Sequence, residues 1–190
     1  MGRLKELGAP VVLVTCPVEV GKRRLNQGFV WSKDAARGVH FKNYLPNDRG
    51  YYEASWYERG DLSFSPFNTA KWKGGYMICS DLWSMRNASK YGKTGVHFIA
   101  VPRASEKSSV DKWVAAGKVA AVLSEAYVFS SNRTGKRGTA EFGGCGWVID
   151  PDGRLLAVTS RGEQYATVEV DLRIAEEAKS TYPRDILQPE

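Results

Sequence analysis

The sequence predicts a mixed sheet covered by helices, in the α/β or α+β class. Three observations support this class. Short apolar runs, rich in β-branched and aromatic residues and bounded by Gly, Pro, Asp or Ser, recur along the chain. Segments with helical spacing interleave with some of these runs. The 190 residues are 43% hydrophobic and contain no internal repeat or linker, so we expect a single domain over residues 1–190.

The apolar runs give the expected strands in chain order. They lie at residues 11–14, 28–31, 39–41, 76–79, 96–101, 127–130, 147–149, 155–158 and 166–170. Residues 148–156 predict a hairpin, because a Pro-Asp-Gly turn lies between two apolar runs.

Three segments are predicted to be helical, at residues 81–90, 109–125 and 171–179. The clearest is 109–125, where the apolar residues fall near helical spacing and Ser109 can cap the first turn. Alternating strands and helices followed by a run of strands favour a mixed sheet.

The charge and cysteine patterns exclude several classes of protein. The net charge is +6, but 21 acidic residues are interspersed among 27 basic ones, and a nucleic-acid footprint needs basic side chains gathered on one face. The apolar run at residues 9–18 is too short to span a bilayer and lacks a signal-peptide pattern, so we expect a cytoplasmic protein without a membrane partner. Three separated cysteines and two histidines argue against a disulfide framework or a zinc site, and we expect neither metal nor cofactor.

Cys79 ends the apolar run Gly75-Tyr-Met-Ile-Cys79, and the polar pair Ser80-Asp81 follows at once. A side chain just beyond a strand lies where open α/β sheets collect reactive groups. If a helix begins there, its free N–H groups favour a thiolate and offer the Ser80 amide to an oxyanion. The alternative is a buried structural thiol, which is our interpretation of Cys16 and Cys145.

A second stretch, residues 39–61, carries Lys42 at the end of a short apolar run and Glu53 beyond a loop rich in Pro, Gly, Asn and Asp. Each residue alone would be interpreted as a solvated surface side chain.

Taken together, these segments resemble the carbon-nitrogen hydrolase family, also called the nitrilase superfamily. The lysine lies in a K-x-x-L-P-like segment at 42–46 and the cysteine in a G-x-x-x-C-like segment at 75–79. The resemblance continues in family order through His97-Phe-Ile-Ala-Val-Pro-Arg-Ala-Ser105, residues 126–133 and the hairpin at 146–153.

The resemblance implies a four-layer α-β-β-α sandwich of two mixed sheets that forms a homo-oligomer, a dimer or larger. It also implies catalytic roles: Cys79 attacks a carbonyl or nitrile carbon, Lys42 and the backbone N–H of Ser80 stabilise the developing charge, and Glu53 orients Lys42. By analogy, further side chains line the substrate pocket. These are Tyr52, Trp83 and Arg103.

This sequence departs from the family pattern at its start. The family's general-base glutamate ends an early strand, upstream of the segment that residues 1–20 resemble, so we expect an N-terminal strand and helix to be missing. The favoured function is hydrolysis of an aliphatic or N-carbamoyl-type amide through a Cys79 thioester, because Ser80-Asp81-Leu82 replaces the Trp-Glu that nitrilases carry after the cysteine. The alternatives are a nitrilase and a non-catalytic or truncated descendant acting as a binding or dimerisation module.

Overall fold

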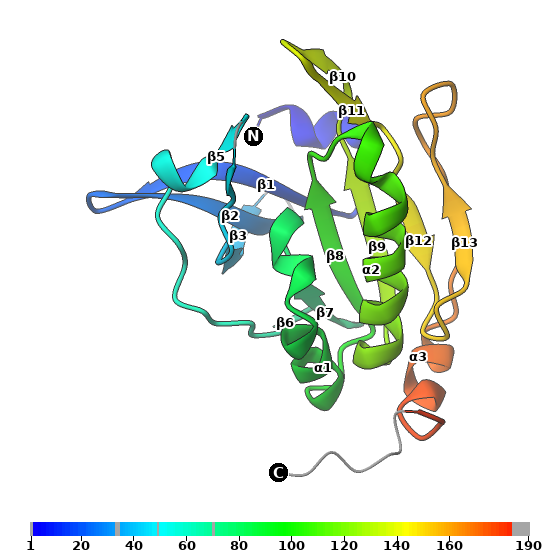
Figure 1. Cartoon of the computed structure of the whole chain (residues 1–190). Coiled ribbons are helices and arrows are strands. Elements are labelled where there is room, and N and C mark those ends of the chain that lie inside the picture. The colour runs from blue at the N-terminus through cyan, green and yellow to red at the C-terminus, as the bar shows by residue number, and fades with distance from the viewer. Residues whose placement is uncertain (1, 33–34, 49, 70, 184–190) are drawn as a thin grey trace.

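The computed structural model describes residues 2–32, 35–48, 50–69 and 71–183 (Figure 1). Its α-helices are α1 (Met85–Lys93), α2 (Val110–Ser124) and α3 (Leu172–Ala178). Its 3₁₀ helices are η1 (Gly2–Leu7), η2 (Glu53–Ser55), η3 (Cys79–Trp83) and η4 (Lys107–Ser109). The strands are β1 (Val11–Val20), β2 (Arg23–Ser32), β3 (Ala35–Phe41), β4 (Asn47–Asp48), β5 (Tyr51–Tyr52), β6 (Phe67–Asn68), β7 (Lys73–Tyr76), β8 (Phe98–Arg103), β9 (Tyr127–Asn132), β10 (Thr134–Arg137), β11 (Ala140–Gly143), β12 (Trp147–Ile149) and β13 (Leu155–Val158).

The larger sheet has six strands in the order β13-β12-β9-β8-β7-β6. Its central strands β7, β8 and β9 are parallel, and the strands on either side of them are antiparallel. Parallel neighbours need a crossover, and α1 and α2 provide the two crossovers here. The carboxyl ends of β7, β8 and β9 therefore lie along one edge of the sheet.

The two faces of this sheet carry alternate residues, as the pleat requires. Met77, Ile99 and Val101 pack against α1 and α2, which lie over the sheet in Figure 1. Tyr76 and Ala100 belong to a second cluster on the opposite face. Burying apolar side chains on both faces accounts for the apolar runs that predicted these strands.

A smaller sheet of order β1-β2-β3 covers that opposite face. Val30 lies in the second cluster, with Val11 and Leu13 packed against it, and the Tyr76 hydroxyl donates to the Val14 carbonyl at 2.8 Å. Helices, larger sheet and smaller sheet thus stack as three successive layers of the predicted α-β-β-α sandwich, which confirms the fold class.

Several predicted elements have the right type and close boundaries. The hairpin β12–β13 is confirmed, with Gly153 at φ +79° in its turn. Helix α3 begins after Asp171, whose carboxylate accepts the Arg173 N–H at 2.9 Å. The strands β1 and β2 are longer than predicted and pair with each other along their whole length. The residues near the turn of this hairpin are exposed, so backbone hydrogen bonds hold them in the strands, and no apolar run marks them in the sequence.

Other predictions about elements were wrong. Residues 166–170 form no strand, since they have no ladder partner in the part of the chain that the structure describes. Ser109 does not cap α2; its hydroxyl donates to the Glu106 carbonyl at 2.8 Å, and η4 precedes the helix. No described helix is both long enough and apolar enough to cross a membrane.

Candidate active site

The nucleophile candidate Cys79 lies in a sharp turn beyond β7. The strand ends at Tyr76, three residues earlier than predicted, because the Ile78 N–H donates to Asp81 Oδ2 at 3.0 Å rather than to a strand. Cys79 then adopts φ +51°, a left-handed conformation that costs a residue with a side chain about 1 kcal/mol. Strain of this kind persists where surrounding contacts enforce it, and it clusters at functional sites.

The helix predicted at residues 81–90 is divided into two. Cys79 starts the 3₁₀ helix η3, which is 5 residues long, and α1 begins only at Met85. A short 3₁₀ helix aligns fewer peptide dipoles than the expected α-helix would, so the helix terminus contributes less charge stabilisation than the sequence suggested. The Cys79 side chain is partly buried and touches both hydrophobic clusters.

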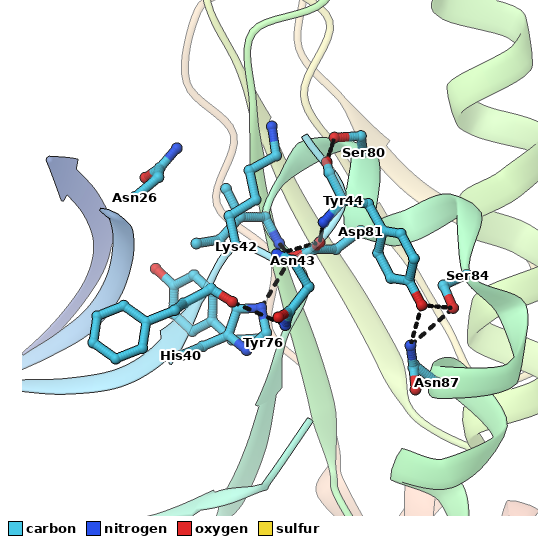
Figure 2. Close-up of polar contacts among 12 residues, drawn as sticks. Asn26, His40, Lys42, Asn43, Tyr44, Tyr76, Ser80, Asp81, Ser84 and Asn87 are labelled. Carbon is cyan, nitrogen blue, oxygen red and sulfur yellow. Dashed lines mark hydrogen bonds and ion pairs between the residues drawn. The ribbon is translucent and has the colours of Figure 1, made fainter. Parts of the chain in front are cut away.

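Asp81 ties the turn of the cysteine to the segment of the lysine. Its carboxylate is completely buried and accepts four hydrogen bonds (Figure 2). Oδ1 accepts the N–H groups of Asn43 at 3.0 Å and Tyr44 at 2.9 Å. Oδ2 accepts the N–H of Ile78 at 3.0 Å and lies 2.9 Å from Nε2 of His40. The residues directly after Lys42 are therefore held against the turn that contains Cys79.

Lys42 follows β3 directly, as predicted, and its side chain is only 2% exposed. Its Nζ donates to Glu53 Oε2. Asn26 on β2 supports both residues: its Nδ2 donates to Glu53 Oε1 at 3.2 Å, and its carbonyl accepts the Lys42 N–H at 2.9 Å. The structure therefore brings the predicted lysine and glutamate together as an ion pair oriented by an asparagine.

Sequence reasoning missed Asn26 and Asp81 as structural partners of the site. The only local sequence signal for Asn26 was that its polar side chain lies beside the apolar residues of β2. Asp81 directly follows the Cys79-Ser80 pair, but its hydrogen-bond partners could not be predicted, because they include residues up to 41 positions away in the sequence.

Ser80 and Trp83 border a cavity of about 630 Å³ beside the turn. The Ser80 hydroxyl donates to the Tyr44 carbonyl, as Figure 2 shows. The Trp83 side chain is 49% exposed, and its ring lies 4.8 Å from that of Trp113. Its lining contains two of the predicted site residues, Ser80 and Trp83, but does not include Cys79, Lys42 or Glu53.

Arg103 ends β8 and is 7% exposed. Its Nε donates to Ser130 Oγ at 2.8 Å, one terminal nitrogen to Ser105 Oγ at 2.6 Å and the other to the Cys145 carbonyl. Burial lowers the pKa of the guanidinium to about 10. Its stacking partners are the rings of Trp113 and Trp147, at 5.6 Å and 5.5 Å. The guanidinium of Arg103 therefore links β8 to β9 and to two loops. Only the N–H groups that these acceptors do not use are available for the predicted contact with substrate.

Tyr51, next to the predicted pocket residue Tyr52, contacts the loop after β8. Tyr52 is 52% exposed. The Tyr51 hydroxyl donates to Glu106 Oε1 at 3.2 Å. Burial, followed by the charges of Glu106 and Cys79, raises the pKa of Tyr51 to about 12.

A comparison with protein families gives the context of this site. The family model described as "Carbon-nitrogen hydrolase" matches residues 5–180. The chain belongs to the carbon-nitrogen hydrolase family. This confirms the family expected from the order of the motifs.

Curated relatives of this chain include two amidases. An N-carbamoylputrescine amidase of Solanum tuberosum is 28% identical over 180 residues, which cover 86% of this chain and 60% of that protein. A 2-oxoglutaramate amidase of Bacillus subtilis is 27% identical over 111 residues, 58% of this chain and 43% of that protein. The chain thus spans 60% or less of the length of these two relatives.

Among solved structures, a carbon-nitrogen hydrolase from Helicobacter pylori G27 superposes with a TM-score of 0.85 at 26% sequence identity. The match covers 92% of this chain and 66% of that chain. The stacked sheets therefore have the fold of that carbon-nitrogen hydrolase.

Proposed function

We propose that this hydrolase cleaves a non-peptide carbon-nitrogen bond of an aliphatic or N-carbamoyl-type amide, with Cys79 as the nucleophile. The observation that carries the proposal is the Asp81 carboxylate, which joins the backbone after Lys42 to the strained turn of Cys79. A buried ammonium and a thiol whose backbone segments are joined by one carboxylate suit acyl transfer better than they suit a purely structural core.

The proposed reaction has two steps. Cys79 Sγ attacks the carbonyl carbon, and its proton passes to the nitrogen that leaves as ammonia or an amine. Lys42 Nζ and the Ser80 N–H stabilise the oxyanion of the tetrahedral intermediate, while Glu53 and Asn26 orient the ammonium. Water then attacks the thioester carbonyl, releases the acid and restores the thiol.

Two features favour an amide over a nitrile. The residues after the cysteine are Ser80-Asp81-Leu82, and Asp81 is committed to the backbone. Among the curated relatives, amidase names outnumber the nitrilase name, which belongs to a Pyrococcus abyssi protein, and one of the amidase names specifies an N-carbamoyl substrate. A nitrilase activity would proceed through a thioimidate and would release the same acid from a nitrile.

A specific observation favours the second candidate, a non-catalytic binding or dimerisation module. No residue that the structure describes hydrogen-bonds Cys79 Sγ, and the Glu53 carboxylate is already engaged by Lys42 and Asn26. A thiol without a positioned base loses about 100- to 10,000-fold in rate. The predicted homo-oligomer and cytoplasmic location stay predictions; light scattering of the purified protein checks the first.

The experiment measures ammonia release from aliphatic amides, N-carbamoyl amines and the matching nitriles. We expect hydrolysis of an amide by the wild type, loss of turnover in Cys79→Ala and Lys42→Met, and full activity in Cys16→Ser as the matched thiol control. Iodoacetamide labelling with mass spectrometry reports thiol access independently. A Cys79 that is alkylated readily in a protein without turnover on any panel member would support the non-catalytic module.

A further inference from the structure

The cavity of about 630 Å³ beside the turn of Cys79 lies between two segments of the chain, residues 43–46 and residues 80–84. The Asp81 carboxylate joins these segments, since it accepts the N–H groups of Asn43 at 3.0 Å and Tyr44 at 2.9 Å. Two walls of the cavity are therefore fixed relative to each other by one buried group.

The cavity lies away from the proposed catalytic ion pair. Figure 2 shows the side chains of Lys42 and Tyr44 pointing in different directions. The Lys42 ammonium donates to Glu53, whereas the Tyr44 hydroxyl accepts the Ser84 hydroxyl at 3.3 Å. Tyr44 and Ser84 line the cavity, but Lys42 and Glu53 do not. A ligand in this cavity need not take part in the reaction proposed for Cys79.

Two half-exposed aromatic rings border the cavity. Trp83 is 49% exposed and Tyr44 is 41% exposed. Each ring packs against a buried aromatic residue, with ring centroids 4.8 Å apart for Trp83 and Trp113 and 6.3 Å apart for Tyr44 and Phe64. Both rings are thus held in place while they leave apolar surface for a ligand.

Arg59 lines the same cavity and comes from a third segment of the chain. Its neighbour Gly60 donates its N–H to the Lys42 carbonyl at 2.9 Å. The backbone at Gly60 also packs directly against Asn43, because a Cβ added there would lie 2.7 Å from Asn43 Oδ1. The backbone next to Arg59 is therefore fixed against the segment that follows Lys42.

The charge of Arg59 is not compensated within the described chain. Among the described residues that line the cavity, Arg59 alone has an ionised side chain, and its guanidinium has no hydrogen-bond, ion-pair or stacking partner there. The neighbouring acidic residues are engaged elsewhere. Glu58 pairs with Arg23 at 3.1 Å, and the Asp61 carboxylate accepts the Ser63 N–H at 2.9 Å.

The other polar side chains of the lining are engaged with the protein. Asn43 Oδ1 accepts the Leu62 N–H at 2.8 Å. The Ser80 hydroxyl donates to the Tyr44 carbonyl, and the Ser84 hydroxyl donates to the Tyr44 hydroxyl. Of the polar side chains that the structure describes in this lining, the guanidinium is the one left to bind a ligand.

We propose that this cavity binds a small amphipathic carboxylate, with the carboxylate on Arg59 and an apolar or aromatic body against Tyr44 and Trp83. A guanidinium binds a carboxylate through two parallel N–H bonds, and charge-assisted bonds are stronger than neutral ones. Leu45 and Pro46 add apolar surface for the body of the ligand. Among ligands of one shape, the negative charge should therefore decide affinity.

The probes are 4-phenylbutanoate, 4-phenylbutan-1-ol and 4-phenylbutylamine, which share one body and differ in charge. None contains an amide or a nitrile, so the test does not depend on turnover. Isothermal titration calorimetry of the full chain measures the Kd of each probe. We expect the carboxylate to bind about tenfold more tightly than the alcohol, and the amine to bind most weakly.

Three variants test the role of the guanidinium. Arg59→Gln removes the charge and should bring the Kd values of carboxylate and alcohol to within about twofold of each other. Arg59→Lys keeps the charge and should retain part of the preference for the carboxylate. Arg161→Gln is the matched control, because Arg161 is exposed and does not line the cavity, and it should keep the wild-type preference.

A wild type that binds the three probes equally, or an Arg59→Gln variant that keeps the preference, would overturn the proposal. Equal weakening of all three probes in Arg59→Gln would also overturn it, since this result indicates a packing role for the side chain. Photo-crosslinking of the wild type with 4-benzoylbenzoate needs no variant. Peptide mass spectrometry should place the label in residues 43–46 or 80–84, and a label only outside the cavity lining would contradict the proposal.

Discussion

Replacing Asp81 by asparagine changes one oxygen of a carboxylate that is fully buried and accepts four hydrogen bonds. The new amide nitrogen must face either the Asn43 and Tyr44 N–H groups or the Ile78 N–H and His40, so two donors lose their acceptor. Each buried donor left without a partner costs about 1–3 kcal/mol, and the remaining bonds lose their charge assistance. We therefore expect a loss of about 3–5 kcal/mol, a large share of the roughly 5–15 kcal/mol that stabilises a domain.

The assay is urea unfolding followed by circular dichroism, together with the rate of Cys79 alkylation in the folded state. Asp171→Asn is the control, because Asp171 accepts the Arg173 N–H at a helix start that is exposed to solvent. We expect a much smaller loss of stability there and an unchanged alkylation rate. Had Asp81→Asn cost no more stability than Asp171→Asn, with Cys79 alkylated at the wild-type rate, the reasoning about the shared carboxylate would be wrong.

Two further predictions concern the cysteines. Cys79 has φ +51°, a conformation that glycine adopts without strain. Cys79→Gly should therefore be more stable than Cys79→Ala by about 1 kcal/mol, although alanine is usually the more stabilising of the two residues. Urea unfolding of both variants measures this difference, and equal stabilities would contradict the prediction. Burial raises the pKa of Cys16 and Cys145, so their reactive thiolates should become abundant only as the pH rises above 9. Alkylation of both measured from pH 7 to 10 should rise steeply at the upper end, and a plateau below pH 8 would refute the burial of these thiols.

The strands that could be predicted from the sequence are those whose side chains pack against other elements on both faces of the larger sheet. The runs at residues 96–101 and 127–130 are apolar because both faces of β8 and β9 are covered, so composition alone marks them. The strand expected at residues 166–170 is also rich in β-branched residues, but it has no neighbour to pair with in the described chain. Composition signals a tendency to form a strand, whereas the ladder depends on distant residues.

The same reasoning explains what was found and missed at the site. Lys42 and Glu53 could be predicted because family resemblance supplied their relation, and the structure pairs them. Asn26, Tyr51 and Glu106 carry no motif, and their contacts join segments far apart in the sequence. The roles of Cys79 and of the pocket residues stay predictions until turnover is measured.

The contacts of Asp81 also have a consequence for how the candidate site is assembled. Lys42 directly follows a strand of the smaller sheet, and Cys79 lies in the turn after a strand of the larger one, so the Asp81 carboxylate joins the ends of strands from both layers. The two proposed catalytic side chains therefore depend on different sheets for their positions. Under the proposed function, they would be brought together only when both layers are packed against each other.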